Sequence, residues 1–334
     1  TGETVGRVAK GDASDARTAI EAADAVKREW EGRSPIEYER PLRAVAERIE
    51  AEADDIAELL SRETGKCLAT AEGEVAETAA QFRFYAGVTD KVRGDTVPTA
   101  SNRLNYTRRV PYGVTAHVVP WNYPLLLGTR GIASALATGN TVVAKPPTQA
   151  PLSTMWIGEI MLEEFPDGVV NVVPGPGSEV GGELSANAHV DAITFTGSTG
   201  VGKGVLKSAA DHVTPVDLEL GGKAPSIVLP DADLENAARG VVAGIFSNAG
   251  QNCVATSRCL VHESVHEELV EKIVEKTERI TLGPGTDPET DMGPVISEGA
   301  REDILSYVES AKEEGATLLT GGGVPDDDAL AAGT

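Results

Sequence analysis

Hydrophobic residues recur at helical spacing in the first part of the chain. Alanine, isoleucine and valine do so across residues 12–31, and leucine, valine and isoleucine do so across residues 38–63. Apolar positions three and four residues apart lie on one face of a helix. Residues 1–92 are therefore predicted to be helical.

The pattern changes in residues 93–111, where Thr, Asn and Tyr alternate with other residues and Pro98 comes early. This composition favours extended structure over a helix. The segment is predicted to form a β-hairpin or arm outside the core.

From Gly113 onward, short apolar runs alternate with segments of helical periodicity. Strands are predicted at residues 114–119, 141–144, 169–173, 192–195, 226–229, 258–261 and 316–319. Helices are predicted at residues 125–138, 152–165, 179–186, 200–210, 234–247 and 297–314, with another that ends near residue 280. This alternation predicts a parallel α/β sheet, followed after Gly221 by a second α/β unit.

Composition is that of a globular protein. A chain of 334 residues suggests two domains, and its 41% hydrophobic and 24% charged residues are ordinary values. No apolar run approaches the roughly 18 residues that span a bilayer, and no secretory signal opens the sequence. A soluble, cytoplasmic protein without membrane partners is expected.

The net charge of −23 is the unusual bulk property. It argues against nucleic-acid binding, which requires a basic face. Acidic residues outnumber basic ones along the whole chain, which favours a surface adapted to high salt. The alternative is an ordinary soluble acidic enzyme.

Two segments carry candidate chemistry. Leu218-Glu219-Leu220-Gly221-Gly222-Lys223 and Gly250-Gln251-Asn252-Cys253 place a carboxylate 34 positions before a thiol (253 − 219). A thiol nucleophile and a carboxylate that activates water suffice to make and hydrolyse a thioester. Taken singly, Cys253 could be an inert buried cysteine and Glu219 a solvent-facing strand residue.

The strand that precedes the two glycines alternates in polarity. Val216, Leu218 and Leu220 fall on one face, so Glu219 falls on the other. The other cysteines, Cys67 and Cys259, are predicted to be inert, and the sparse, odd count fits a reducing compartment.

Two more segments complete a pattern: Pro120-Trp121-Asn122-Tyr123-Pro124 and Phe195-Thr196-Gly197-Ser198-Thr199. In this order and spacing, the four segments resemble the NAD(P)-dependent aldehyde dehydrogenase superfamily across essentially the whole chain. The resemblance implies a Rossmann-like parallel-sheet cofactor domain and a second α/β catalytic domain. It also implies that the chain lacks the C-terminal portion of the family.

The resemblance assigns roles to these regions. Residues 1–92 and 112–220 correspond to the dinucleotide-binding domain, 93–111 to the oligomerisation β-arm, and 221–334 to an incomplete catalytic domain. A homodimer or homotetramer of the full-length protein is implied.

It also assigns site residues. Cys253 corresponds to the nucleophile, Glu219 to the general base for the deacylating water, and Asn122 to the oxyanion donor. Asn122 could instead cap the helix that follows it. The implied cofactor-binding residues lie in several separate loops: Trp121, Lys145, Thr148, Gly177, Gly197, Ser198, Gly202 and Leu220.

Cofactor preference depends on Thr148. Family members that prefer NAD often carry a glutamate three residues after the ribose-binding lysine, whereas this chain has Thr148 after Lys145. Thr148 leaves room for a 2′-phosphate, so NAD and NADP both stay open, with a tilt towards NADP.

One motif is treated as a chance match. His262-Glu263-Ser264-Val265-His266 has the spacing of zinc hydrolases, which need both histidines on one helical face. His262 ends a predicted strand, and Ser264 with Glu267 predicts a capping box that starts the helix later. No metal is therefore expected.

The predicted activity is oxidation of an aldehyde to a carboxylate through a thiohemiacetal and a thioester. One alternative is a coenzyme A-acylating semialdehyde dehydrogenase, whose members usually lack the glutamate. Another is an impaired fragment that acts only as a folded or binding module. Arg130 lies where relatives that act on carboxylated aldehydes carry an arginine, although Ser247 stands where such enzymes often have a second one. Arg130 could equally be a solvated charge on its helix, and the substrate stays open.

Overall fold

The computed structural model describes residues 4–326, 330 and 333. The chain divides into two compact units. The first, here called the sheet unit, comprises Gly6–Ala57 and Glu72–Leu220. The second, the cysteine unit, comprises Thr1–Val5, Glu58–Ala71 and Gly221–Thr334.

Helices fill the N-terminal region: α1 (Ala13–Glu31), α2 (Pro35–Ala51), α3 (Ala53–Thr64) and α4 (Leu68–Ala86). Asp12 caps α1 in a capping box with Asp15. The helical segment predicted across 38–63 is two helices, interrupted at Glu52. Asp54 and Asp55 occupy the first turn of α3, where carboxylates favour a helix N-terminus, so a new helix starts there.

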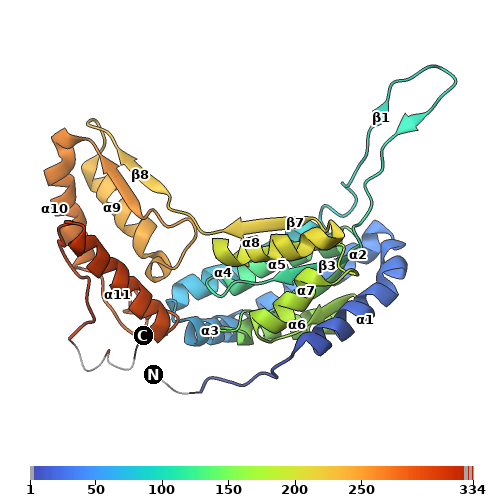
Figure 1. Cartoon of the computed structure of the whole chain (residues 1–334), viewed down its shortest axis with the longest axis horizontal. Coiled ribbons are helices and arrows are strands. Elements are labelled where there is room, and N and C mark those ends of the chain that lie inside the picture. The colour runs from blue at the N-terminus through green and yellow to red at the C-terminus, as the bar shows by residue number, and fades with distance from the viewer. Residues whose placement is uncertain (1–3, 327–329, 331–332, 334) are drawn as a thin grey trace. The chain divides into compact units, whose positions relative to one another are not determined.

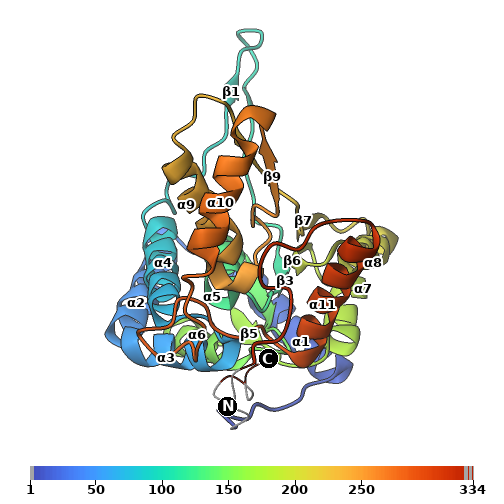
Figure 2. The ribbon, with the colours of Figure 1, turned by 90° about the vertical axis from the view of Figure 1, so that its left-hand side faces the viewer.

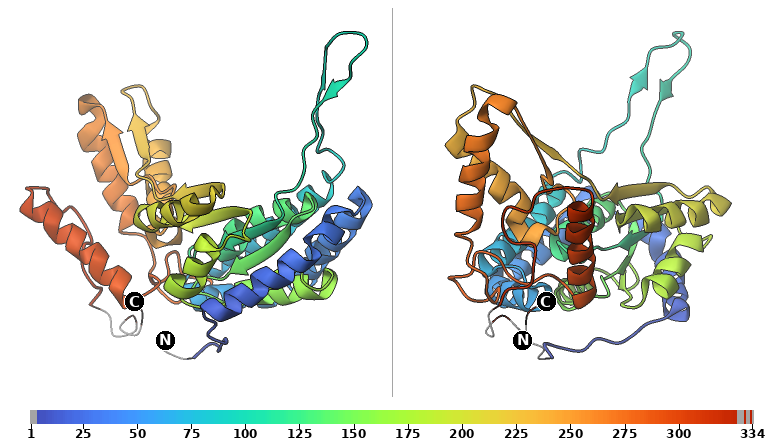
Figure 3. Two further views of the ribbon diagram at one scale, coloured as in Figure 1. Left: turned by 45° about the vertical axis from the view of Figure 1, so that its right-hand side comes forward. Right: turned by 60° about the vertical axis from the view of Figure 1, so that its left-hand side comes forward.

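The predicted arm is a hairpin. Its strands β1 (Thr96–Val97) and β2 (Asn105–Tyr106) pair antiparallel, and the segment projects from the rest of the sheet unit (Figures 1 and 3). Several of its apolar side chains are exposed, among them Leu104 and Val110.

The sheet unit contains a five-stranded parallel sheet, as the alternating pattern predicted. Its strands are β3 (Val114–Val118), β4 (Thr141–Lys145), β5 (Val170–Val172), β6 (Ala192–Gly197) and β7 (Val216–Leu220). The strand order is β5-β4-β3-β6-β7. From β3, the chain builds outward to β4 and β5 on one side and to β6 and β7 on the other.

Helices cover both faces of this sheet (Figure 1). α1, α7 (Gly182–Ala186) and α8 (Thr199–Ala209) pack on one face, and α5 (Pro124–Ala137) and α6 (Leu152–Glu164) on the other. The first face buries an apolar cluster that includes Ile20, Val143 and Phe195. Burial on both faces is what a parallel sheet requires.

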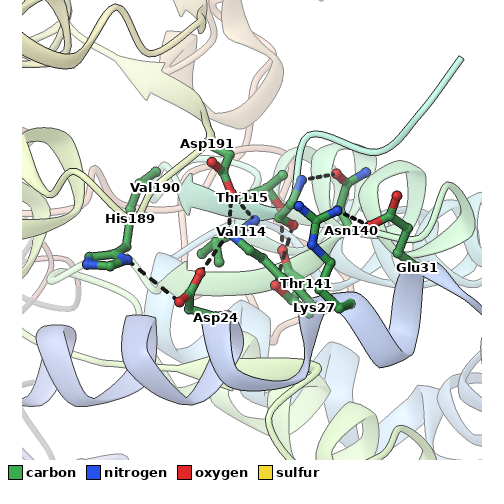
Figure 4. Close-up of polar contacts among 12 residues, drawn as sticks. Asp24, Lys27, Glu31, Val114, Thr115, Asn140, Thr141, His189, Val190 and Asp191 are labelled. Atoms are coloured by element: carbon green, nitrogen blue, oxygen red, sulfur yellow. Dashed lines mark hydrogen bonds and ion pairs between the residues drawn. The ribbon is translucent and has the colours of Figure 1, made fainter.

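Polar contacts join α1 to the start of the sheet (Figure 4). The Asp191 carboxylate accepts from Val114 N at 2.9 Å and from Lys27 Nζ at 3.1 Å. Lys27 also pairs with Asp24 at 2.7 Å. Beside them, Asn140 Oδ1 accepts from Gly113 N at 3.0 Å. These contacts fix the amino-terminal edge of the sheet, opposite the predicted site.

The cysteine unit contains a parallel pair, β8 (Pro225–Val228) and β9 (Arg258–Val261), with α9 (Leu234–Phe246) and α10 (His266–Thr277) packed together beside it (Figure 2). Val228, Ala238 and Leu269 form its buried centre. Helix α11 spans Glu298–Glu313. The strand predicted at 316–319 is wrong: within the described residues this segment pairs with no strand, so its apolar residues form no ladder.

Among the described residues, none of the helices is long and apolar enough to cross a membrane.

Candidate active site

The carboxyl edge of the sheet gathers predicted site residues from separate parts of the sequence. Connections run in opposite directions from β3, so the point between β3 and β6 is a topological switch point. Ligands of open α/β sheets bind outside the carboxyl ends of strands at such a point. The loop with Trp121 and Asn122 follows β3, and Gly197 and Ser198 end β6 and begin the next turn.

Asn122 lies in the turn between β3 and α5 and is half-buried. The N-cap of α5 is Tyr123, which makes no side-chain cap hydrogen bond. Glu74 of α4 supplies the cap instead: its Oε1 accepts from Leu125 N at 2.9 Å and from Leu126 N at 3.2 Å. Glu74 therefore binds the two amides that a capping side chain would satisfy.

Glu219 lies on β7, the edge strand of the sheet. Leu218 and Leu220 pack against the core on the α1 and α8 face, as the alternation predicted, and Glu219 is exposed on the other side. There its Oε1 lies 3.0 Å from Arg130 Nη2 of α5. Glu219 is thus held on the same face as the helix that follows Asn122.

Cys253 belongs to the cysteine unit and follows a strained turn. Asn248, Ala249 and Gly250 have φ values of 52°, 55° and 74°. Left-handed backbone is costly for residues with a Cβ and gathers at functional sites.

Side-chain contacts hold this turn. Gln251 Oε1 accepts from Ile296 N at 2.8 Å, while Gln251 Nε2 donates to Asn248 O at 3.2 Å. A Cβ at Gly222 would lie 2.9 Å from Cys253 O, so a glycine is needed there for close approach. The half-buried Cys253 thiol donates to Asn252 Oδ1 at 3.8 Å.

The two other thiols are Cys67 and Cys259. Loss of part of their hydration raises the pKa of Cys67 and the pKa of Cys259, which disfavours their thiolates. Cys259 lies on β9 as predicted, yet its side chain is exposed rather than packed in an apolar core.

Lys145 ends β4 with a buried side chain. Burial lowers its pKa to about 8, and Nζ donates to Pro146 O at 2.6 Å. Thr148 is exposed, and its hydroxyl donates to Gly175 O at 3.3 Å. A Cβ at Gly181 would lie 3.7 Å from Lys145 Cδ. The Lys145 loop therefore lies beside the loop that contains Gly177, where a π-helix (Gly177–Gly181) runs into α7.

At the N-terminus of α8, glycines allow other groups to approach the backbone closely. Ser198 caps it by accepting from Val201 N at 3.4 Å. A Cβ at Gly197 would lie 2.6 Å from the Phe195 ring, and one at Gly202 would lie 2.7 Å from Leu220 Cδ2. Free amides at a helix N-terminus suit a pyrophosphate, and the Lys145 ammonium suits ribose hydroxyls, so this donor set fits a dinucleotide.

The zinc-like motif has another local structure. His262 caps a short 3₁₀ turn (Glu263–Val265) by accepting from Ser264 N at 3.2 Å, and α10 begins at His266. The capping box predicted from Ser264 and Glu267 is wrong, because Val265 is the N-cap residue. Across the part of the chain that the structure describes, no group of three or more His, Cys, Asp or Glu residues could hold a metal.

Two features that shape the candidate site were not predicted from the sequence. Glu74 sits in an alanine-rich helix with no local signal that it caps a helix 51 residues later. The left-handed conformations at Asn248 and Ala249 were also not evident, although the glycine that follows was a hint.

Sheet order, switch point and helix N-terminus define a Rossmann-like α/β unit of the kind that binds dinucleotides. The comparison with known families agrees: the aldehyde dehydrogenase family profile matches residues 1–333. The chain belongs to this family.

Individual relatives are similar along nearly the whole chain. Hydroxyisobutyraldehyde dehydrogenase from Mycolicibacterium austroafricanum is 42% identical over 98% of this chain and 65% of its own length. Alpha-ketoglutarate semialdehyde dehydrogenase from Haloferax volcanii is 40% identical over 99% of this chain and 69% of its own length.

Solved structures agree in fold. PnpE in complex with nicotinamide adenine dinucleotide matches with a TM-score of 0.97 and 41% identity, over 99% of this chain and 69% of that one. Betaine aldehyde dehydrogenase from Staphylococcus aureus in complex with NAD⁺ matches with a TM-score of 0.96 and 38% identity, over 98% of this chain and 66% of that one. The chain thus spans about two-thirds of the length of these relatives.

Proposed function

We propose that this protein oxidises an aldehyde to a carboxylate with NAD⁺ or NADP⁺. The observation that supports the proposal is the position of Asn122, Glu219 and the dinucleotide-suited loops on one edge of the sheet, in a chain of the aldehyde dehydrogenase family that also carries Cys253. Solved relatives with bound NAD support the cofactor class.

The chemistry begins at Cys253. Its thiolate attacks the aldehyde carbon, and a thiohemiacetal with an oxyanion forms. The Asn122 amide and the Cys253 backbone N–H would donate to that oxyanion. A bound nicotinamide would supply the hydride acceptor, and loss of hydride from this carbon would leave a thioester on Cys253.

Glu219 would complete the cycle. Its carboxylate takes a proton from water, the hydroxide adds to the thioester carbon, and the C–S bond breaks to release the carboxylate and the thiolate. The second candidate, transfer of the acyl group to coenzyme A, needs no base for water. A carboxylate at Glu219, on the face of α5, favours hydrolysis.

Residues on the carboxyl edge would hold the dinucleotide. Lys145 and Thr148 would contact the adenosine ribose beside Gly177, and the turn from Gly197 through Ser198 to Gly202 would receive the pyrophosphate. Trp121 and Leu220 would border the nicotinamide end. The sheet unit is accordingly the dinucleotide-binding domain, and residues 221–334 supply the catalytic one.

The arm supports assembly with further copies of this chain as a homodimer or homotetramer. Residues 93–111 carry four arginines and one aspartate, whereas the whole chain has a net charge of −23. A basic hairpin with exposed Leu104 and Tyr106 suits an acidic partner such as a second copy. A cytoplasmic location and a salt-adapted surface belong to the same proposal.

Two variants test the activity. Cys253→Ala should abolish aldehyde-dependent NAD(P)H formation but leave dinucleotide binding, measured by calorimetry, unchanged. Glu219→Gln should give one burst of NAD(P)H per active site, then slow turnover, because only hydrolysis needs the base. Near wild-type oxidation by Cys253→Ala would refute the nucleophile assignment.

A further inference from the structure

The Arg130–Glu219 ion pair lies entirely within the sheet unit. Arg130 projects from α5 and Glu219 from β7, and their closest atoms are 3.0 Å apart. Both side chains are partly open to solvent, with relative exposures of 42% and 49%. The pair brings a cation to the one carboxylate that the proposed reaction uses as a base.

We propose that Arg130 is a positioning residue for the deacylation step. It holds the Glu219 carboxylate on the α5 face and limits the rotamers that this base can adopt. This inference rests on the proposed function and extends it to a residue outside the reacting atoms.

The surroundings of Glu219 show why it needs such a contact. Glu219 is on the edge strand β7, one residue before the sheet unit ends at Leu220. Leu218 and Leu220 anchor the backbone in the core, but they leave the glutamate side chain exposed on the opposite face. An exposed glutamate samples several rotamers, and a general base must stay within reach of one water.

Arg130 supplies the restraint from a fixed point. It lies about two turns into α5. The preceding residue, Thr129, is buried, and Glu74 caps the N-terminus of the helix. The same helix directly follows the turn that carries Asn122. The closest contact is at Glu219 Oε1, so Arg130 restrains the carboxylate through that oxygen.

Exposed ion pairs are weak, which sets the expected size of the effect. Such pairs contribute up to about 1 kcal/mol, so losing one changes a rate by up to about fivefold. Arg130→Met should therefore slow deacylation about three- to fivefold and leave acylation unchanged. Arg130→Lys should recover most of the rate, because an ammonium can still pair with Glu219.

An activated ester isolates the step. The Cys253 thiolate attacks the carbonyl of 4-nitrophenyl acetate, the ester C–O bond breaks, and 4-nitrophenolate leaves. Water then hydrolyses the acetyl thioester with Glu219 as base and releases acetate. The burst of 4-nitrophenolate measures acylation and the linear phase measures deacylation, without dinucleotide or hydride transfer.

The expected result is a normal burst and a slower linear phase for Arg130→Met. Glu219→Gln should nearly abolish the linear phase, and adding Arg130→Met to it should have no further effect. Arg43→Met is the matched control, since Arg43 pairs with Glu39 at 2.6 Å on α2 of the same unit with 49% exposure. It should behave as wild type.

A linear phase unchanged by Arg130→Met would overturn the proposal, as would a parallel fall of burst and linear phase, which indicates a structural role. Additive unfolding midpoints for the Arg130→Met and Glu219→Gln double variant would overturn the pair itself, whatever the activity. If the wild-type protein hydrolyses the ester with a burst and a linear phase but oxidises no aldehyde, the proposed function is refuted and the role of Arg130 in deacylation stands.

Discussion

His117 makes the sheet unit sensitive to acid in a way that can be calculated. It lies in the middle of β3 and is 4% exposed. Thr115 Oγ1 donates its proton to Thr141 O at 2.8 Å, so it accepts from His117 Nε2 at 2.9 Å. In the neutral ring, Nδ1 therefore carries no proton, and it has no hydrogen-bond partner in the structure.

Protonation would place a buried N–H at Nδ1 against α5. A Cβ at Gly131 would lie only 2.8 Å from Nδ1, which leaves little space for an acceptor. Burial accordingly lowers the pKa of His117 from 6.5 to about 4. The unfolded chain binds this proton more readily, so the stability contributed by neutral His117 is complete above pH 6.5 and is lost as the pH falls towards 4.

Linkage converts this difference into a magnitude. Between pH 7 and pH 5, His117 should remove about 2 kcal/mol from the free energy of unfolding, and about 3 kcal/mol by pH 4. His117→Gln keeps a donor for Thr115 but does not titrate. The wild-type protein should therefore lose about 2 kcal/mol more than the variant between these two pH values.

Urea unfolding followed by tryptophan fluorescence measures this difference. The three tryptophans, Trp30, Trp121 and Trp156, all belong to the sheet unit and report on it alone. Carboxylates titrate alike in both proteins, so their contributions cancel in the comparison. Parallel stability curves for the two proteins from pH 7 to pH 5 would refute the reasoning.

Three further predictions follow from particular contacts. Glu74→Ala should lower the stability of the sheet unit by about 1 kcal/mol, because two amides at the start of α5 lose their acceptor. Glu74→Gln should retain most of this stability. Equal urea midpoints for wild type and Glu74→Ala would contradict the prediction. Raising sodium chloride from about 0.1 M to about 1 M should raise the thermal midpoint of unfolding. The Debye length falls from about 10 Å to about 3 Å, which screens the self-repulsion of a chain with a net charge of −23. A flat or falling midpoint would argue against a salt-adapted surface. Thr148→Glu should weaken NADP binding selectively, by about 1 kcal/mol or more, because the carboxylate repels the 2′-phosphate. The ratio of kcat/KM for the two cofactors measures this effect. An unchanged ratio would mean that residue 148 does not reach the ribose.

Local sequence patterns predicted most helices and strands well, because the formation of a helix or strand depends largely on nearby residues. The alternation in 216–220 correctly placed Leu218 and Glu219 on opposite faces, with Leu218 packed against the core and Glu219 exposed. The break at Glu52 was missed because the apolar spacing continues across it. The strand at 316–319 was wrong because a strand also requires a neighbour, which no local pattern specifies.

Contacts across long sequence separations escaped prediction for the same reason. Residues 58–71 belong to the cysteine unit, although they continue a helical region of the sheet unit. The ring-nitrogen environment of His117 depends on Thr141 and Gly131, which reach it only through the sheet order and the packing of α5. The resemblance to a family pointed to Glu219, but only the fold showed that Arg130 faces it.

The predicted catalytic side chains are held by two different physical means. Asn122 and Glu219 lie at an edge of a sheet that is buried on both faces, so ordinary packing fixes their backbones. Cys253 instead follows two left-handed residues with a Cβ, each of which costs about 1 kcal/mol or more. The contacts of Gln251 with Ile296 and Asn248 offset that strain. Because loss of Gln251 would leave the strain uncompensated, the turn before Cys253 is the place where a small change should most readily displace the thiol.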